Sequence, residues 1–277
     1  MDAGAQQKAA VARAFGATAA DYDQSGVEFF GLFAQRLVEH LRPRPGWHVV
    51  DVGAGRGAVV FPLADAVGDG GSVTALDLAE PMVTALAQEV AARNLRSVTV
   101  RVGDAEHLAV ADGVADAVTA SMVLFFLPDV GRGLREFHRV LRPGGLLACT
   151  VFGEPDPRWA EVYNAFNLFL PPGQRLDDSR PRHPALDAGA IVDTVRAAGF
   201  AQVECIDEVH PIHFADVEQW HTWSWSVGLR GTWLQIPQNL RPQARDAVLA
   251  AVRAQAAPDG SITEQFAVRT VLARRGQ

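Results

Sequence analysis

The sequence predicts an α/β protein built on a doubly wound, largely parallel sheet. Short apolar segments alternate with helical ones between residues 47 and 152, which indicates strand–helix–strand units. A glycine-rich turn, Gly53-Ala54-Gly55-Arg56-Gly57, follows the first apolar segment. Right-handed crossovers in such a sheet place ligands at the carboxyl ends of the strands. We therefore expect a ligand site at that edge.

The elements of this core follow in order along the chain. Two helices come first, because Phe29, Phe33 and Leu37 recur at helical spacing. Pro81 opens a later helix, at a position where its missing N–H costs nothing. The expected helices are 5–15, 26–41, 59–67, 80–94 and 128–141, and the expected strands are 47–52, 72–76, 98–102, 115–120 and 146–152.

Beyond residue 152 the pattern is less regular. Residues 153–186 are rich in proline and are expected to be irregular. Further on we expect helices at 187–198, 216–227 and 242–256 and strands at 202–207 and 264–272. We interpret the chain, 1–277, as a single domain with a helical lid at 1–45, a cofactor-binding core at 46–152, and cap insertions at 153–186 and 211–262.

Composition narrows the class of function. The net charge of −7 argues against a nucleic-acid or anionic membrane surface, and Lys8, the only lysine, indicates arginine-rich codon usage. Cys149 and Cys205 are far apart and belong to no metal-binding spacing, so we expect neither a disulfide nor a metal. No apolar run approaches the roughly 20 residues of a membrane span. Without a signal-peptide pattern either, a cytoplasmic protein is expected.

The glycine turn alone is compatible with two classes of cofactor. Gly53-x-Gly55-x-x-Ala58 also fits the dinucleotide fingerprint. Asp77, at the end of the second strand, suits the ribose of either NAD or S-adenosylmethionine, or simply caps a helix. Gly103-Asp104-Ala105 ends the third strand, where a carboxylate can accept a hydrogen bond from adenine, and a dinucleotide enzyme has no standing need for that acid. Arg139-Val140-Leu141-Arg142-Pro143-Gly144-Gly145 precedes the fifth strand.

In this order the motifs resemble those of class I S-adenosylmethionine-dependent methyltransferases, in particular the small-molecule branch with the ubiquinone and menaquinone C-methyltransferases. The cap resembles that of secondary-metabolite methyltransferases. In the family an acid stands two residues before the glycine turn, as Asp51 precedes Gly53. The resemblance implies a Rossmann-like, seven-stranded sheet with an antiparallel last strand, and S-adenosyl-L-methionine as cofactor. It further implies that Asp77 holds the ribose and Asp104 meets the adenine edge.

The residues expected to bind this cofactor lie after the strands and in the lid. Ser121 and Met122, after the fourth strand, are expected on the methionine side, and Tyr22 near the sulfonium or packing the lid. The full set is Tyr22, Asp51, Gly53, Ala54, Gly55, Asp77, Leu78, Met82, Gly103, Asp104, Ala105, Ser121 and Met122.

The acceptor side is predicted from aromatic residues. Four of the six tryptophans fall in the second insertion, where they either pack a core or line an apolar pocket. Residues 123–126 are apolar where many relatives have a histidine, which removes a candidate base. Glu154 and Asp156 are also expected near the acceptor. The expected acceptor contacts are Phe30, Phe126, Trp159, Trp220 and Trp223, and the candidate catalytic residues are His183 and Tyr22.

Three functions are compatible with these observations. The favoured one is methyl transfer to a small, largely apolar acceptor, in secondary metabolism. A NAD-type oxidoreductase is disfavoured by the motifs at 103–105 and 139–145. A protein that binds the cofactor without methyl transfer, as a cyclase or regulator, is not separated from the first by sequence. The partner expected is a small molecule, while the methylated atom and any assembly into homo-oligomers stay open.

Overall fold

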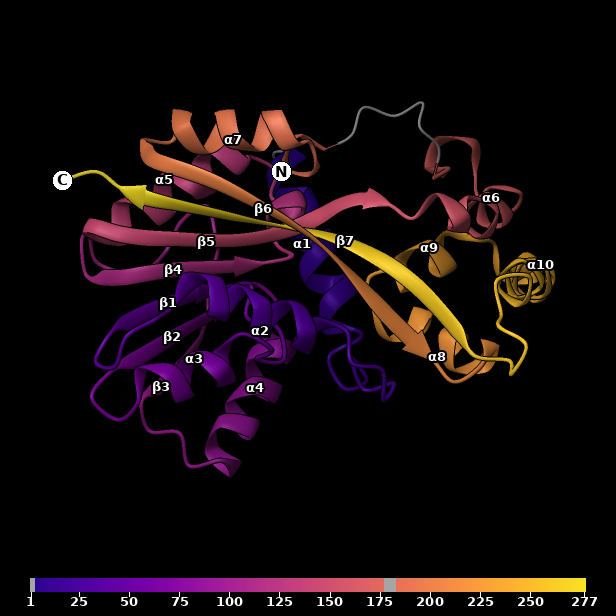
Figure 1. Cartoon of the computed structure of the whole chain (residues 1–277), viewed down its shortest axis with the longest axis horizontal. Coiled ribbons are helices and arrows are strands. Elements are labelled where there is room, and N and C mark those ends of the chain that lie inside the picture. The colour runs from indigo at the N-terminus through magenta and orange to yellow at the C-terminus, as the bar shows by residue number, and fades with distance from the viewer. Residues whose placement is uncertain (1–2, 177–182) are drawn as a thin grey trace.

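The computed structural model describes residues 3–176 and 183–277, and their strands form a seven-stranded sheet of order β3-β2-β1-β4-β5-β7-β6 (Figure 1). Strands β1 to β5 run parallel, and β7 is antiparallel to both of its neighbours, β5 and β6. The predicted doubly wound sheet with an antiparallel last strand is confirmed. The strands are β1 (His48–Val52), β2 (Ser72–Asp77), β3 (Val98–Val102), β4 (Ala115–Ser121), β5 (Leu141–Pro155), β6 (Phe200–Phe214) and β7 (Ile262–Arg275).

Helices cover both faces of the sheet, which explains why its central strands are apolar throughout. Val49 and Val50 of β1 alternate in direction and enter two different hydrophobic clusters. The cluster around Val49 includes Leu37 and Leu63, and the cluster around Val50 includes Phe137. The first face carries α2 (Phe30–Leu41), α3 (Val60–Val67) and α4 (Glu80–Ala92), and the second carries α5 (Val130–Val140) and α7 (Ala188–Ala197).

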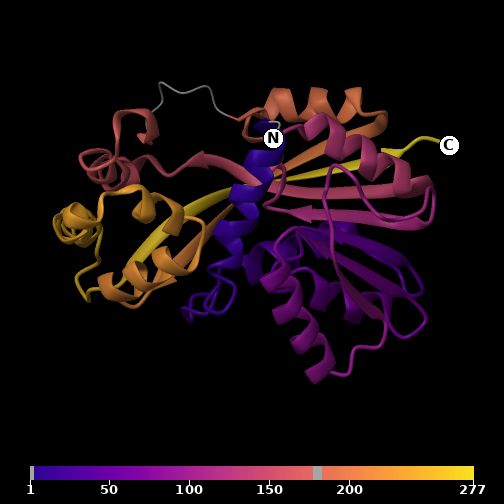
Figure 2. The ribbon, with the colours of Figure 1, turned by 180° about the vertical axis from the view of Figure 1, so that it is seen from behind.

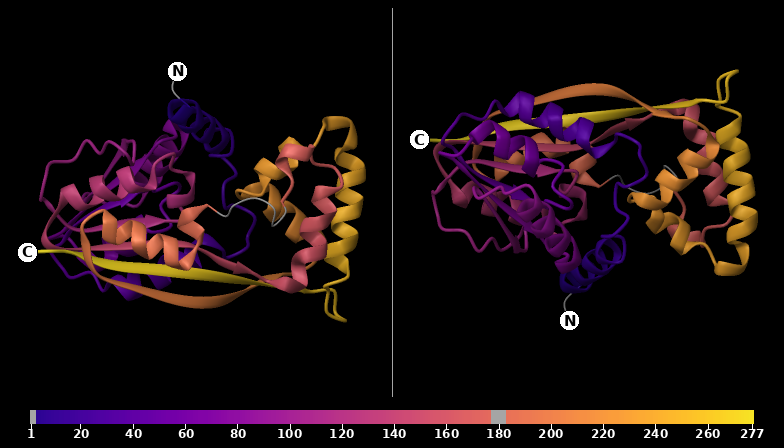
Figure 3. Two further views of the ribbon diagram at one scale, coloured as in Figure 1. Left: turned by 90° about the horizontal axis from the view of Figure 1, so that it is seen from above. Right: turned by 90° about the horizontal axis from the view of Figure 1, so that it is seen from below.

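Strands β6 and β7 continue beyond the rest of the sheet and carry the cap at their far end (Figure 3). Their pairing runs from Phe200 opposite Arg275 to Phe214 opposite Ile262, whereas β5 leaves β7 at the pair Pro155–Phe266. The cap helices share a third hydrophobic cluster, and α10 packs against both α6 and α8. These helices are α6 (Ala160–Asn167), α8 (Val217–Ser226), α9 (Arg230–Gln235) and α10 (Arg241–Arg253).

The N-terminal helix α1 (Ala3–Gly16) crosses the open edge between the core sheet and the cap (Figure 2). It contacts α4, and Gly16 lies close to Pro81, where a Cβ would be 3.3 Å from the proline ring. None of the helices in the two described ranges is long and apolar enough to cross a membrane.

Two expectations for the later part of the chain are wrong. Residues 153–186 are not irregular throughout, because they contain α6 and short 3₁₀ helices such as Pro157–Trp159; residues 177–182 lie outside the described ranges. The strand expected at 202–207 extends to Phe214, so part of the expected insertion belongs to the sheet. Prolines favour a loop interpretation, yet Pro157 stands at a helix start, where it is tolerated.

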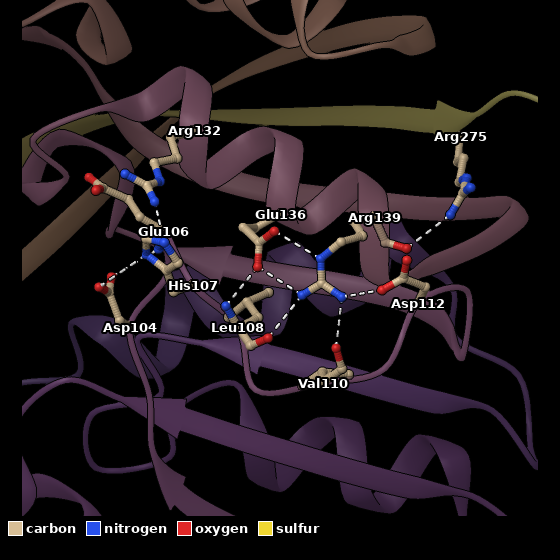
Figure 4. Close-up of polar contacts among 10 residues, drawn as sticks. All are labelled: Asp104, Glu106, His107, Leu108, Val110, Asp112, Arg132, Glu136, Arg139 and Arg275. Carbon is tan, nitrogen blue, oxygen red and sulfur yellow. Dashed lines mark hydrogen bonds and ion pairs between the residues drawn. The ribbon is translucent and has the colours of Figure 1, made fainter.

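Arg139, the first residue of the 139–145 motif, lies in the last turn of α5 just before β5 and organises the loop between β3 and β4 (Figure 4). Its guanidinium donates hydrogen bonds to the carbonyl oxygens of Leu108 and Val110, both at 2.9 Å. It also pairs with the carboxylates of Glu136, at 2.8 Å, and Asp112. This part of the motif therefore holds the loop that begins at Asp104.

Replacing Arg139 by methionine is expected to lower the free energy of unfolding by about 1.5–3 kcal/mol, because hydrogen bonds to a charged group are lost and two carbonyls lose a donor. Urea unfolding measures this change. Arg135→Met on the same helix is the control. Arg135 is 60% exposed, and its ion pair with Asp129 is long, at 3.9 Å. Equal stability of the two variants would contradict the role given to Arg139.

Candidate active site

Two cavities meet at the carboxyl ends of the central strands. The strand-end cavity, of about 160 Å³, lies over β1, β2, β3 and β4. The cap cavity, of about 430 Å³, lies between the sheet edge and the cap helices. Both are lined by the same five residues, which we call the junction: Phe15, Tyr22, Phe30, Met122 and Phe126.

The glycine turn exposes main-chain atoms, without large side chains, to the strand-end cavity. Gly53 and Ala54 both donate their N–H groups to the carbonyl of Leu76, at 2.7 and 3.0 Å, which ties β1 to β2. A Cβ on Gly53 would lie 2.3 Å from a methyl carbon of Val123, so only glycine fits. Gly55 has a φ of +51°, and no atom lies within 4 Å of the place its Cβ would take. A ligand can therefore approach the turn closely.

Asp77 fixes this turn and also lines the strand-end cavity. Its two carboxylate oxygens accept hydrogen bonds from the N–H groups of Gly55 and Ala79, both at 2.8 Å. Burial raises the pKa of Asp77, and the backbone donors oppose the rise. Each carboxylate oxygen can accept a second bond. Asp77 can therefore hold the turn in place and bind a ligand at the same time.

Asp51 is a buried carboxylate with one unsatisfied oxygen. Thr119 donates its hydroxyl to Oδ1 at 2.6 Å, while Oδ2 has no partner. Burial raises the pKa of Asp51 to about 7, opposed by the Thr119 hydrogen bond. Buried polar atoms are rarely left without a partner, so an orphan oxygen in a cavity wall fits a ligand that brings a donor or a positive charge.

Lys8 closes α1 over the far side of the same cavity. Its ammonium group lies 2.7 Å from carboxylate oxygens of both Asp104 and Glu106. Asp104 also accepts the N–H of Glu106 at 2.9 Å, which holds the loop after β3. The single lysine of the chain thus has a structural role that codon usage does not explain.

The junction consists of packed aromatic rings and of Met122, whose backbone conformation is unusual. Tyr22 stacks on Phe30 with ring centroids 5.4 Å apart, and Phe15 meets Tyr22 and Phe126 edge-on. Met122 has a φ of +56°, which is rare for a side chain of its size, and its N–H bonds to the Thr150 carbonyl at 2.9 Å. Such backbones concentrate at functional sites.

The cap cavity is walled mainly by aromatic and aliphatic side chains. Tyr163 and the acids Glu154, Asp156 and Glu264 interrupt this apolar surface. Asp156 pairs with Arg158 at 2.6 Å, whereas the two described residues that donate hydrogen bonds to Glu264, Tyr163 and Trp220, are neutral. The main apolar lining residues are Phe29, Phe125, Phe152, Trp223, Val227, Leu229 and Phe266.

The residues predicted to bind cofactor come together in one place. All of them line the strand-end cavity, and Tyr22 and Met122 also face the cap cavity. Their individual roles stay predictions. Sequence reasoning missed Lys8, Tyr163 and Glu264; the one signal available for Glu264 was an acid within the apolar alternation of the last strand.

The predicted acceptor contacts divide into two groups. Phe30, Phe126 and Trp223 line the cap cavity. Trp159 and Trp220 are not on its wall but stack on each other, with ring centroids 5.8 Å apart, because both are buried in the cap cluster. His183 lines neither cavity, since a short 3₁₀ helix follows it and its Nδ1 accepts the N–H of Ala185 at 3.2 Å. The expected placement of these three residues is corrected accordingly.

Within residues 3–176 and 183–277, no group of three or more histidine, cysteine, aspartate or glutamate side chains is arranged to hold a metal ion.

Comparisons with known proteins agree with this geometry. A family described as a methyltransferase domain matches residues 50–149. A nocamycin O-methyltransferase of Saccharothrix syringae is 38% identical over 266 residues, which cover 91% of this chain and 94% of that protein. An aklanonic acid methyltransferase of Streptomyces sp. strain C5 is 38% identical over 166 residues, 60% of this chain and 71% of its own.

Among solved structures, the YcgJ protein of Bacillus subtilis shares the fold, with a TM-score of 0.60 and 18% identity over 88% of this chain and 98% of that one. The relative from Saccharothrix is similar over nine-tenths of both chains. This protein therefore belongs to the S-adenosylmethionine-dependent methyltransferases.

Proposed function

We propose that this enzyme transfers the methyl group of S-adenosylmethionine to an oxygen atom of a small, largely apolar acceptor in secondary metabolism. The observation that carries the proposal is the junction shared by two cavities: one over the sheet, lined by the predicted cofactor-binding residues, and a larger aromatic one under the cap. The choice of oxygen is supported by the Saccharothrix relative, which is named an O-methyltransferase.

The strand-end cavity offers a partner for each polar part of the cofactor. Asp77 keeps a free lone pair on each oxygen for the ribose hydroxyl groups. The unsatisfied oxygen of Asp51 suits the ammonium group of the methionine part. Asp104, held by Lys8 and the Glu106 N–H, suits the adenine amino group. These assignments agree with the donors and acceptors that the residues still have available.

When bound, the cofactor supplies a methyl group that its positive sulfur has already activated. The protein then has to align the acceptor and keep water away. Tyr22, Phe30 and Phe126 do this at the junction, where their rings pack on one another and on Phe15. Apolar walls also disfavour the concentrated charge before transfer more than the dispersed charge during it.

The acceptor's proton is the remaining requirement. The described residues that line the cap cavity include no histidine, lysine or arginine. An acceptor oxygen that ionises easily, as in a phenol, an enol or a carboxylic acid, needs no strong base in the wall. The geometry therefore favours such acceptors over aliphatic alcohols.

The alternative, a protein that binds the cofactor without transferring methyl, is separated by product mass. Incubation with cofactor that carries a deuterium-labelled methyl group and a panel of phenolic and carboxylic acceptors is expected to give products heavier by one labelled methyl. S-adenosylhomocysteine should suppress their formation. Conversion of an acceptor without any gain of mass would instead support a cyclase.

Asp77→Ala is expected to weaken S-adenosylhomocysteine binding by about 1.5–3 kcal/mol, because hydrogen bonds to a charged group are lost. Asp104→Ala should cost less, since the adenine also makes apolar contacts in this cavity. Calorimetric titration measures both. Asp246→Ala is the control, because that acid is 80% exposed on α10. Unchanged affinity in Asp77→Ala would show that the ribose assignment is wrong.

Trp223→Phe is expected to raise the acceptor KM while cofactor affinity and melting temperature stay close to wild type. Trp223 lines the cap cavity, and its indole N–H has no protein partner. Trp233→Phe is the matched control: Trp233 is equally buried, does not line the cavity, and donates to Ser224 at 2.9 Å. That variant should lose stability instead. A reversed pattern would place Trp223 in the packing of the cap only.

A further inference from the structure

Strand β7 presents an acid on a face that is otherwise hydrophobic. Ile262, Glu264, Phe266 and Val268 alternate along the strand and face the cap cluster. Glu264 is only 2% exposed, which is about as buried as Ile262 and Val268 on the same face. A carboxyl group at such a position is costly to bury, so its presence calls for a physical reason.

The groups that hold Glu264 stabilise it without neutralising it. Tyr163 on α6 donates its hydroxyl to one carboxylate oxygen at 2.7 Å, and Trp220 on α8 donates its indole N–H to the other at 3.3 Å. Among the described residues, the charged group that raises the pKa of Glu264 through its electrostatic field is another acid, Asp156. Burial raises the pKa of Glu264 to about 7, opposed by the two hydrogen bonds.

A purely structural role explains these contacts poorly. A buried acid that pairs with a cation can add specificity to a fold, but the described walls around Glu264 hold no lysine, arginine or histidine. Glutamine would offer an acceptor at this position at a lower desolvation cost. A polar group supplied by a bound molecule accounts for the acid more simply, because each of its oxygens can accept a second hydrogen bond.

The position of Glu264 defines which part of a bound molecule it reaches. Glu264 and Tyr163 line the cap cavity and not the strand-end cavity, whereas the junction residues line both. The methylated oxygen must lie at the junction, next to the cofactor. Glu264 therefore meets the acceptor away from the reacting atom, and it acts in recognition rather than in proton transfer.

We propose that Glu264, oriented by Tyr163 and Trp220, accepts a hydrogen bond from a second hydroxyl group of the acceptor, remote from the oxygen that is methylated. This inference rests on the proposed function of the same cavity. The acceptor class is then an apolar, ring-containing molecule with two separated hydroxyl-type groups. A molecule with an anionic group at the remote end would be repelled by Glu264 and by Asp156 and Glu154 beside it.

The test compares two probes that differ only in the remote hydroxyl: a naphthol and the diol that has a second hydroxyl at the opposite end of the rings. Binding is measured by calorimetry with S-adenosylhomocysteine present, so that no turnover is needed. The wild-type protein is expected to bind the diol at least about tenfold more tightly, the size of one hydrogen bond to a charged group. Glu264→Gln should lose most of that preference with unchanged S-adenosylhomocysteine affinity.

A control and a second variant keep the test decisive. Glu204→Gln, at an exposed acid on the neighbouring strand β6, should keep the preference for the diol. Tyr163→Phe removes a hydrogen bond that stabilises the carboxylate, so the preference should disappear at a higher pH than in the wild type. In the wild type the preference should weaken as the pH falls from about 8 to about 6, because Glu264 becomes protonated.

Equal binding of both probes by the wild type, or the same preference in Glu264→Gln, would overturn the assignment. If Glu264→Gln does not fold, an unshifted pH profile in Tyr163→Phe would do so. A clear preference for the diol together with no methylated product from any acceptor would leave the recognition site standing and refute the proposed function. Failure of the Glu264 assignment can therefore be distinguished from failure of the proposed methyl transfer.

Discussion

The double pairing of β7 is the constraint on which the two-cavity arrangement depends. One part of the strand lies between β5 and β6 in the core sheet, with Val271 in the cluster beneath α5 and α7. The other part, residues 262–265, pairs with β6 alone and carries Glu264 into the cap. A continuous hydrogen-bonded ladder thus sets the distance between core and cap. In the proposed function, the position of the acceptor relative to the cofactor is therefore set by this strand pair rather than by a loop.

The lid connects the same two halves from the open side. Lys8 anchors α1 to the loop after β3, and that loop is in turn held by Arg139. The segment that follows α1 reaches the cap, where the N–H of Asp23 bonds to the Ser226 carbonyl at 3.1 Å. Tyr22 lies between these attachments and faces both cavities. A displacement of Tyr22 would therefore change the walls of both cavities at once.

The strand-end cavity was predictable because its parts are local in sequence. Each of Asp51, Asp77 and Asp104 stands in or just after a strand, and parallel strands bring their carboxyl ends to one edge. The cap was not predictable in this way. Glu264 and Tyr163 are separated by 101 residues and meet only because the long β6–β7 pair carries one of them to α6. The sequence pattern around Tyr163 or around Glu264 does not predict this contact.

The tryptophans show the same limit within one helix. Trp220 and Trp223 lie on one face of α8, so their helical spacing predicts the same surroundings for both. The structure separates them because Trp220 packs on Trp159 and Glu264, whereas Trp223 reaches the cavity between Phe29 and Phe266. Whether a tryptophan of α8 lines the cavity or packs inside the cap therefore depends on the residues that other helices and strands place against it.

We propose that the methyl group is delivered at the junction of the two cavities. A crystal structure of the protein with S-adenosylhomocysteine tests it most directly. We expect the ribose to lie on Asp77, the amino group on Asp51, and the sulfur in contact with the rings of Tyr22 and Phe126, facing the cap cavity. A cofactor whose sulfur points away from these rings, or which binds outside the strand-end cavity, would contradict it.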